Sequence, residues 1–198
     1  MISHKHKCIF IHIPKTGGTS IESALGNWCL TPDNESDLMG DKYLSRHFTL
    51  QSVKKSLREN YFKFAFVRNS WDRAVSHYFY YRDGGNEKSD ARLQRLIPSD
   101  FKSFLTHHCS SHPKIKLKDQ FSYLEVNGEV ELDFIGRFER IEDDYRCISK
   151  KIGLTRKLPH VRASKHKHYT EYYDEETKRI VAEKYARDIE YFGYEFGE

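Results

Sequence analysis

The sequence predicts a single α/β domain over residues 1–198, with a mainly parallel central sheet flanked by helices. Two stretches carry this prediction, because each has a buried apolar run followed directly by a turn and an amphipathic helix. The first stretch begins near Lys7 and the second near Tyr61. This spacing leaves room for the right-handed crossover that joins parallel strands in one sheet.

The first stretch is KCIFIHIPKTGGTSIESAL, residues 7–25. Its apolar, β-branched start, 7–13, is typical of a buried parallel strand, and a helix is expected over about 19–28. Between them lies the turn PKTGGTS, 14–20. Glycines let a backbone approach an anion closely, and a helix N-terminus offers unpaired N–H groups and a favourable dipole. We therefore expect the segment from Lys15 to Ser20 to cradle a nucleotide phosphate.

The second stretch is YFKFAFV, 61–67, which predicts a strand that ends at Arg68. A helix follows, with Asn69 or Ser70 as its N-cap. Apolar side chains recur at helical spacing and predict its buried face: Trp71, Ala74, Val75, Tyr78 and Phe79.

Three further segments are expected to form a helix, a hairpin and another strand of the sheet. A single helix is expected after Thr49, which caps an apolar stripe of Leu50, Val53 and Leu57. The pair Asn127-Gly128 predicts a hairpin, and a core strand follows over 132–138.

The remaining helices have clear start or stop signals. A helix from Pro98 to about His107 and another over 142–152, ended by Gly153, are expected. A long C-terminal helix follows, capped by Asp174 or Thr170.

Composition narrows the class of protein. Hydrophobic residues make up 38% and charged residues 31%, while thirteen Phe and thirteen Tyr supply core area. The formal charge of +4 permits an anionic ligand without indicating nucleic acid. No apolar run is long enough for a membrane span, and the N-terminus lacks the features of a signal peptide. The four cysteines show no paired spacing, which favours free thiols and a cytoplasmic location.

The turn 14–20 is not a Walker A motif, because Lys15 precedes the glycines instead of following them. It resembles the 5′-phosphosulfate loop of sulfotransferases that use 3′-phosphoadenosine 5′-phosphosulfate (PAPS). The segment FVRNSWDRAVSHY resembles the 3′-phosphate motif of the same enzymes, in which a serine follows the arginine by eight residues, as Ser76 follows Arg68. Ser70 departs from that motif, since a proline is common there.

The later segments DFIGRFERIEDDY and LPHVRASKHKHYTEYYDEETKRIVAEKYARDIEYFGYEF also resemble the carbohydrate sulfotransferases, both heparan-type and bacterial, so the resemblance covers nearly the whole chain. The resemblance implies a fold related to the P-loop nucleotide folds. It also implies transfer of a sulfuryl group from PAPS to a hydroxyl, for which a carbohydrate is the expected acceptor. The product is 3′-phosphoadenosine 5′-phosphate (PAP), and this family needs no metal.

The resemblance also assigns residues to roles. Lys15 is the cation that stabilises the negative charge on the leaving phosphate. A transition state in which negative charge develops on oxygen is stabilised by a cation placed near that oxygen. Arg68 and Ser76 hold the 3′-phosphate, and a late basic loop closes over the nucleotide. The residues expected to bind the co-substrate are Pro14, Lys15, Thr16, Gly17, Gly18, Thr19, Ser20, Arg68, Ser76, Arg162, Ser164 and Lys165.

The acceptor hydroxyl needs a base whose pKa lies near neutrality, and histidine is the usual choice. His47 is the candidate, because it precedes a helix in RHFTLQSVKKSL and matches the histidine of the family. His12, on the strand that enters the loop, is more simply a packed or hydrogen-bonded residue. A carboxylate base remains the competing possibility.

Other interpretations predict different ligands. The segment HHCSSH, 107–112, has histidines at helical spacing, but no second cluster supplies further metal ligands. A kinase or nucleotidase that uses ATP would need a Walker-type lysine and a metal-binding carboxylate. In another interpretation, the protein is a non-enzymatic module that binds an anionic polymer through its basic stretch 156–168. The stretch is otherwise interpreted as a charged loop that faces solvent.

Overall fold

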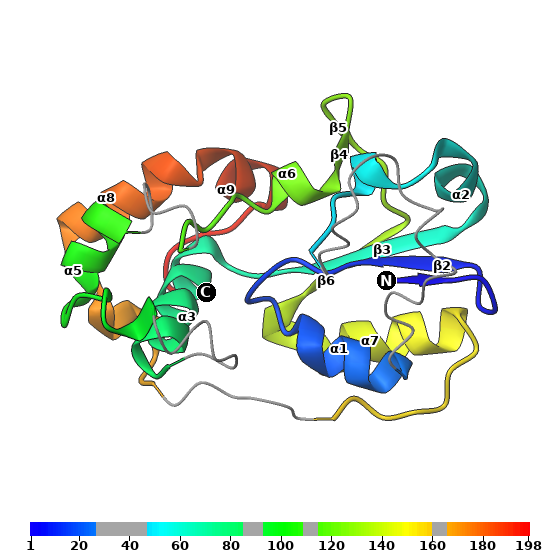
Figure 1. Ribbon diagram of the computed structural model, residues 1–198, viewed down its shortest axis with the longest axis horizontal. Coiled ribbons are helices and arrows are strands. Elements are labelled where there is room, and N and C mark those ends of the chain that lie inside the picture. The colour runs from blue at the N-terminus through cyan, green and yellow to red at the C-terminus, as the bar shows by residue number, and fades with distance from the viewer. Residues whose placement is uncertain (27–46, 85–92, 109–114, 160–165) are drawn as a thin grey trace. The chain divides into compact units, whose positions relative to one another are not determined.

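The computed structural model describes residues 1–26, 47–84, 93–108, 115–159 and 166–198 (Figure 1). The chain forms two compact units. Unit 1 comprises Met1–Arg68 and Gln120–Arg162, and unit 2 comprises Asn69–Asp119 and Ala163–Glu198.

Unit 1 is built on a sheet of four strands in the order β1-β2-β3-β6. The edge strand β1 (Ile2–Ser3) is antiparallel to β2 (Cys8–Ile11). The strands β2, β3 (Phe62–Val67) and β6 (Phe134–Arg137) are parallel. The mainly parallel central sheet predicted from the sequence is therefore confirmed.

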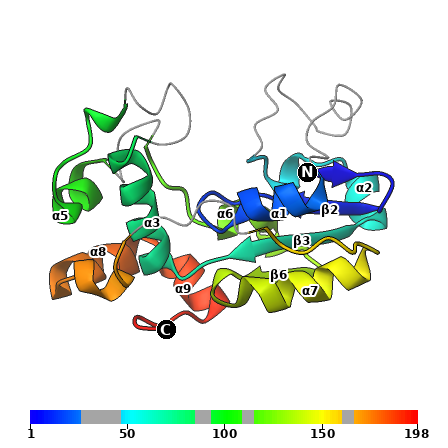
Figure 2. The same ribbon diagram turned by 90° about the horizontal axis from the view of Figure 1, so that it is seen from below.

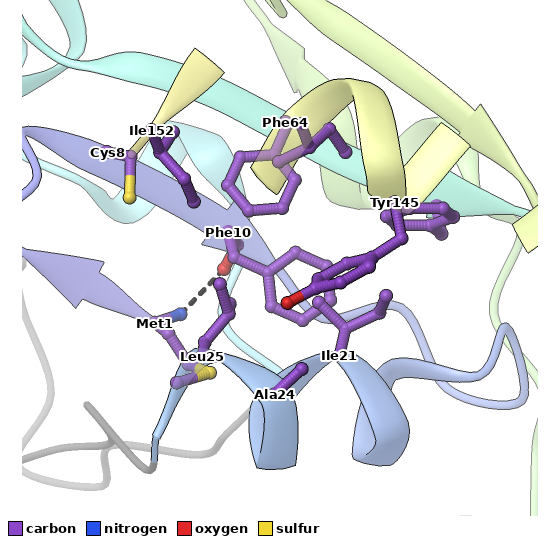
Figure 3. Packing of buried hydrophobic residues seen from close by; sticks show 11 residues of the cluster. Met1, Cys8, Phe10, Ile21, Ala24, Leu25, Phe64, Tyr145 and Ile152 are labelled. Atoms are coloured by element: carbon purple, nitrogen blue, oxygen red, sulfur yellow. Dashed lines mark hydrogen bonds between the residues drawn. The ribbon is translucent and has the colours of Figure 1, made fainter. Parts of the chain in front are cut away.

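Helices α1 (Gly18–Leu25) and α7 (Ile141–Lys151) cover one face of this sheet (Figure 1). Their apolar side chains form one buried cluster with those of β2 and β3 (Figure 3). In that cluster Ile21 and Leu25 of α1 and Ile148 of α7 pack on Phe10 and Phe64. The first predicted strand–turn–helix unit therefore exists because both its strand and its helix bury their apolar residues against each other.

One predicted helix is wrong in detail. The expected helix after Thr49 is divided into a 3-10 turn, η2 (Leu50–Ser52), and a short helix, α2 (Lys55–Asn60). Val53 is fully buried and has the extended conformation (φ −77°, ψ 137°). Its carbonyl accepts a hydrogen bond from Arg58 Nε at 3.1 Å instead of from a helical N–H group. Burial of Val53 thus outweighs the helical periodicity of the segment.

The Asn127-Gly128 prediction is confirmed. Strands β4 (Glu125–Val126) and β5 (Glu129–Val130) pair antiparallel around it. Asn127 and Gly128 both have positive φ, 54° and 91°, as a type I′ turn requires. The short helix α6 (Phe121–Leu124) precedes this hairpin, and the 3-10 turn η4 (Phe138–Arg140) joins β6 to α7.

Unit 2 is helical in the part that the structure describes, and α8 (Glu175–Lys184) packs on α3 (Ser70–Arg82) (Figure 2). Asn69 is the N-cap of α3, because its side chain accepts a hydrogen bond from the Trp71 N–H group at 3.0 Å. The expected apolar face of α3 is buried. The helix expected from Pro98 begins only after Asp100, as α5 (Phe101–Ser103), and continues as the π-helical turn η3 (Phe104–His108).

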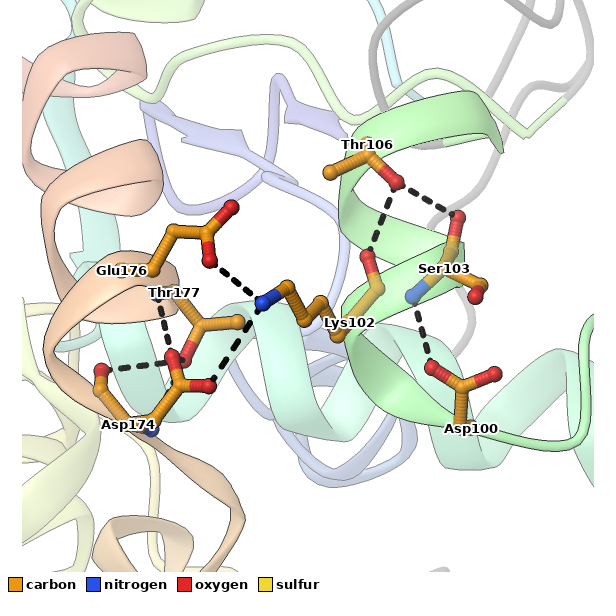
Figure 4. Close-up of polar contacts among 7 residues, drawn as sticks. All are labelled: Asp100, Lys102, Ser103, Thr106, Asp174, Glu176 and Thr177. Atoms are coloured by element: carbon orange, nitrogen blue, oxygen red, sulfur yellow. Dashed lines mark hydrogen bonds and ion pairs between the residues drawn. The ribbon is translucent and has the colours of Figure 1, made fainter.

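The 3-10 turn η5 (Tyr169–Tyr172) precedes the C-terminal helices of unit 2. The long C-terminal helix is divided at Tyr185 into α8 and α9 (Ala186–Phe192). Asp174 is its N-cap and forms a capping box with Thr177. Lys102 of α5 bonds to the carboxylates of Asp174 and Glu176, which ties α5 to the start of α8 (Figure 4).

Two expectations from composition concern the membrane and the cysteines. In the described part of the chain, none of the helices is both long and apolar enough to cross a bilayer. Cys8 is buried and Cys147 is exposed, and both are free thiols. Cys29 and Cys109 lie outside the described residues.

Candidate active site

The three parallel strands bring their carboxyl ends to one edge of the sheet in unit 1. The turn 14–20 follows β2, Arg68 follows β3 and Phe138 follows β6. In open α/β sheets, ligands bind at the carboxyl ends of the strands. The predicted phosphate loop therefore lies where the fold places ligand sites.

The backbone of the loop has the features of an anion cradle. Lys15 and Gly17 have positive φ, 71° and 79°, and they alternate with Thr16 and Gly18, which do not. Alternation of this kind turns successive N–H groups into a concave nest that suits an anion. The N–H groups of Ser20 and Ile21 donate to the Gly17 carbonyl. The first N–H groups of α1, those of Gly18 and Thr19, have no intrahelical acceptor and point out of the helix end.

Both glycines of the loop also lie close against neighbouring side chains. A Cβ atom on Gly17 would lie 2.6 Å from Ile141 Cδ1, and its positive φ disfavours any side chain. A Cβ atom on Gly18 would overlap the imidazole ring of His12. The sequence predicts these glycines from phosphate approach alone, whereas the structure adds two steric reasons.

The hydroxyl groups of the loop differ in their surroundings. Thr16 is fully buried, and its hydroxyl donates to the Ile13 carbonyl at 2.9 Å. This bond closes the turn internally. Thr19 and Lys15 are half-buried and lie at the surface of the loop. The predicted roles of Pro14, Thr16 and Ser20 in holding a phosphate remain predictions.

Arg68 is held between the loop and the sheet. Its backbone N–H and C=O groups form a pair of hydrogen bonds with the buried side-chain amide of Gln120, at 2.9 and 2.8 Å. Its guanidinium group donates to the Lys15 carbonyl at 3.1 Å and lies 3.9 Å from the centre of the Phe138 ring. The residue predicted to bind the 3′-phosphate thus also joins the end of β3 to the phosphate loop.

His47 lies beside the strand that enters the loop. Its Nδ1 atom is 2.9 Å from the main-chain oxygen of His12, and the two imidazole rings meet edge-on with centres 4.5 Å apart. A carbonyl oxygen only accepts hydrogen bonds, so Nδ1 of His47 carries the hydrogen. In the neutral ring, the lone pair then lies on Nε2, which is the nitrogen that could accept a proton.

His12 is a buried residue, and its partner is a carboxylate. Its Nδ1 atom lies 2.7 Å from Glu22 Oε1, and the two side chains are 5% and 2% exposed. Burial and this bond turn the Glu22 carboxylate away from solvent. A carboxylate in this state is poorly placed to take a proton from an acceptor, which favours His47 over Glu22 as the base.

The other predicted residues lie elsewhere. Ser76 lies within α3 in unit 2 and is 3% exposed. Arg162, Ser164 and Lys165 fall outside the described residues. Within the described ranges there is no cluster of three potential metal ligands, while Cys109 and His112 of the HHCSSH segment lie outside them.

Unit 2 has an open hollow of about 730 Å³ that is lined in part by His166 and Lys167, near the end of the basic stretch. Its lining residues are Phe79, Arg82, His166, Lys167, Glu171 and Tyr172. Lys167 is paired with Glu171 at 3.0 Å and Arg82 with Asp83 at 3.1 Å. These pairs leave little net positive charge for an anion.

Sequence reasoning missed Glu22, Gln120 and Phe138. Each acts across the fold, on His12, Arg68 and the loop respectively. One signal for Glu22 was available, since a carboxylate next to Ile21 on the inward face of α1 must find a buried donor. The sequence holds no comparable signal for Gln120 or Phe138, because their partners lie far away along the chain.

Comparisons with known proteins show the family of this chain. A family model described as "Sulfotransferase family" matches residues 1–195. An uncharacterized protein of Archaeoglobus fulgidus is 32% identical over 106 residues, which cover 54% of this chain and 79% of that protein. The crystal structure of mouse sulfotransferase SULT7A1 complexed with PAP is similar in fold, with a TM-score of 0.55 and 13% identity over 94% of this chain and 86% of that one. Because the family model covers nearly the entire sequence, the chain belongs to the sulfotransferase family.

Proposed function

We propose that the protein transfers a sulfuryl group from PAPS to a hydroxyl group of a carbohydrate. The observation that carries the proposal is the loop 14–20, with its alternating backbone and open helix N-terminus, joined to Arg68 at the end of the neighbouring parallel strand. A nucleotide with phosphates at its 5′ and 3′ positions would use both features. The family match and the PAP bound to mouse SULT7A1 support this ligand.

The loop supplies most of the electrostatic stabilisation in this proposal. PAPS provides the sulfuryl group and departs as PAP. Lys15 and the N–H groups of Gly17, Gly18 and Thr19 stabilise the negative charge that develops on the bridging and phosphate oxygens. Arg68 offers a planar fork to the 3′-phosphate, and Ser76 adds a hydroxyl donor.

His47 acts as the general base. Its Nδ1–H group is held by the His12 carbonyl, so Nε2 takes the proton of the acceptor hydroxyl as the oxygen attacks sulfur. The carbohydrate acceptor rests on the sequence resemblance to heparan-type and bacterial carbohydrate sulfotransferases. The two units together form one sulfotransferase domain, an inference that the family match over residues 1–195 supports.

Calorimetry with three nucleotides tests the co-substrate. We expect PAP to bind at least about tenfold more tightly than adenosine 5′-phosphate, which lacks the 3′-phosphate. A charge-assisted hydrogen bond to that phosphate contributes about 1.4 kcal/mol or more, and 1.4 kcal/mol corresponds to a tenfold change in affinity. Arg68→Ala and Ser76→Ala should lose this preference and keep the weaker affinity for adenosine 5′-phosphate. Tight binding of Mg²⁺–ATP with no preference for PAP would contradict the proposal.

The acceptor is tested by incubating the protein with PAPS labelled in its sulfuryl group and a panel of glycans. Label should appear on a glycan hydroxyl and depend on Lys15. Transfer to phenols or proteins with none to any glycan would overturn the acceptor class and leave sulfuryl transfer intact. Binding of anionic polymers without PAP binding would instead favour a non-enzymatic module.

A further inference from the structure

We infer that Glu22 and His12 are positioning residues of the sulfuryl-transfer site, so that the Glu22 carboxylate orders both the phosphate loop and His47 through the His12 residue. The inference rests on the proposed function and adds two residues to it. Neither contacts the reacting atoms in this proposal.

The pair is a buried and directional contact. A carboxylate accepts hydrogen bonds, so the bond of 2.7 Å from His12 Nδ1 to Glu22 Oε1 places a hydrogen on Nδ1. The bond runs from the residue that directly follows β2 to the second turn of α1. It therefore fixes the rotation of the His12 ring and the position of α1 against the strand.

The His12 ring in turn supports the loop. It occupies the space where a side chain on Gly18 would lie, directly against the first residue of α1. It also stacks on Phe10 in the core, with ring centres 5.8 Å apart. A rotation of this ring would open a gap beneath Gly18, whose N–H group is one of those proposed to face the phosphate.

His12 also holds the base. Its carbonyl accepts the Nδ1–H bond of His47, and its ring meets the His47 ring edge-on. One residue thus contacts the loop with its side chain and the base with both its side chain and its main chain. Because Glu22 fixes the rotation of the His12 ring, removal of Glu22 should loosen Gly18 and His47 together.

A purely structural pair predicts a different result. Loss of a buried partner would then lower the free energy of unfolding, yet the folded fraction would keep its PAP affinity and its turnover. Asp188 of unit 2 is fully buried and lies 4.0 Å from Arg73. Its substitution is a control for the effect of removing a buried carboxylate far along the chain from the loop.

The experiment compares Glu22→Ala, Glu22→Gln and Asp188→Asn at a temperature where circular dichroism shows each to be folded. The readouts are PAP affinity, the rate of PAP release from PAPS, and the ¹⁵N shifts of the histidine rings. We expect Glu22→Ala to slow turnover about tenfold or more, since positioning errors cost this much. Glu22→Gln, whose amide oxygen still accepts the bond, should recover most of the loss. Asp188→Asn should lose stability, but its folded fraction should keep wild-type PAP affinity and turnover.

If Glu22→Ala fails to fold, the ¹⁵N spectra of the wild type and of Glu22→Gln test the inference instead. His12 and His47 of the wild type should both show the Nδ1–H tautomer, and Glu22→Gln should keep it. An Nε2–H tautomer at His47 would overturn the inference, as would a folded Glu22→Ala with wild-type turnover and an unchanged His47 signal. Failure of the wild type to bind PAP would refute the proposed function, whereas wild-type activity in Glu22→Ala would refute only this inference.

Discussion

His47 donates its Nδ1–H group to the main-chain oxygen of His12 across 2.9 Å. This bond places the hydrogen of the neutral ring on Nδ1 and its lone pair on Nε2. It also ties His47 to the residue that directly follows β2, shortly before the turn 14–20. The position of His47 therefore depends on this main-chain bond together with the edge-on contact of the His12 ring.

A matched pair of variants separates the anchor of His47 from its basicity. The amide nitrogen of His47→Asn can still donate to the His12 carbonyl, but the side chain has no basic nitrogen, whereas His47→Ala removes both. Loss of a general base typically costs about 10²–10⁴-fold in rate. We expect both variants to lose sulfuryl transfer to that extent and to keep wild-type PAP affinity by calorimetry. Normal transfer by either variant would show that another group takes the proton.

Gly18→Ala tests the steric contact between the loop and His12. Gly18 does not have positive φ, so the cost arises from overlap of the new methyl group with the imidazole ring. Overpacking of this kind typically costs about 1–3 kcal/mol. We expect a loss of this size in urea unfolding, together with weaker PAP binding.

The double variant with His12→Ala provides the control for Gly18→Ala. Removal of the ring makes space for the methyl group, so the double variant should lose less stability than the sum of the two single losses. Additive losses would mean that the methyl group strains the loop for a reason other than His12.

The sequence was sufficient for features that depend on neighbours along the chain. The strand–turn–helix units, the Asn127-Gly128 hairpin and the cap at Asp174 each follow from a local pattern, and the structure confirms them. The backbone of the turn 14–20 belongs to this group, because its glycines and the start of α1 are adjacent in sequence, whereas its binding of a phosphate stays a prediction.

Features that depend on distant partners could not be predicted. The Gln120 amide that holds Arg68 and the Phe138 ring beneath its guanidinium lie 52 and 70 residues away along the chain. Val53 divides the expected helix because its side chain is completely buried, and periodicity alone carries no information about that depth. In each case the tertiary environment decides between local options that the sequence leaves open.

The two described cysteines should differ sharply in reactivity. Burial raises the pKa of the Cys8 thiol from 9.0 to about 12, whereas Cys147 is exposed. At pH 8 we expect iodoacetamide to modify Cys147 and to spare Cys8 until urea unfolds the protein, as shown by mass spectrometry of the peptides. Modification of Cys8 in the folded protein at a rate similar to that of Cys147 would contradict this expectation.

The same pKa shift predicts a pH dependence of stability. Between pH 9 and about 12 the unfolded chain ionises Cys8 while the folded chain keeps it neutral, so proton loss favours unfolding. The contribution of Cys8 is fully present below pH 9 and is lost as the pH rises through that window. Cys8→Ala should therefore show a weaker decline of the urea midpoint above pH 9 than the wild type.

Ser70→Pro should stabilise the protein. Ser70 is the first residue of α3, where proline is well tolerated because the N–H group has no intrahelical acceptor. The preceding residue, Asn69, has a ψ of 126°, which suits a residue before proline. The Ser70 hydroxyl is buried and has no hydrogen-bond partner within the described residues, so its removal relieves a desolvation cost.

The comparison with Ser70→Ala divides this gain into two parts. Alanine removes the unpaired hydroxyl alone, whereas proline also restricts the unfolded chain, which adds about 0.4–1 kcal/mol. Urea unfolding should therefore place the free energy of unfolding in the order wild type, Ser70→Ala, Ser70→Pro, with PAP affinity unchanged. A proline variant less stable than the alanine variant would mean that the pyrrolidine ring does not fit against the buried start of α3, and that this chain has serine there because of packing.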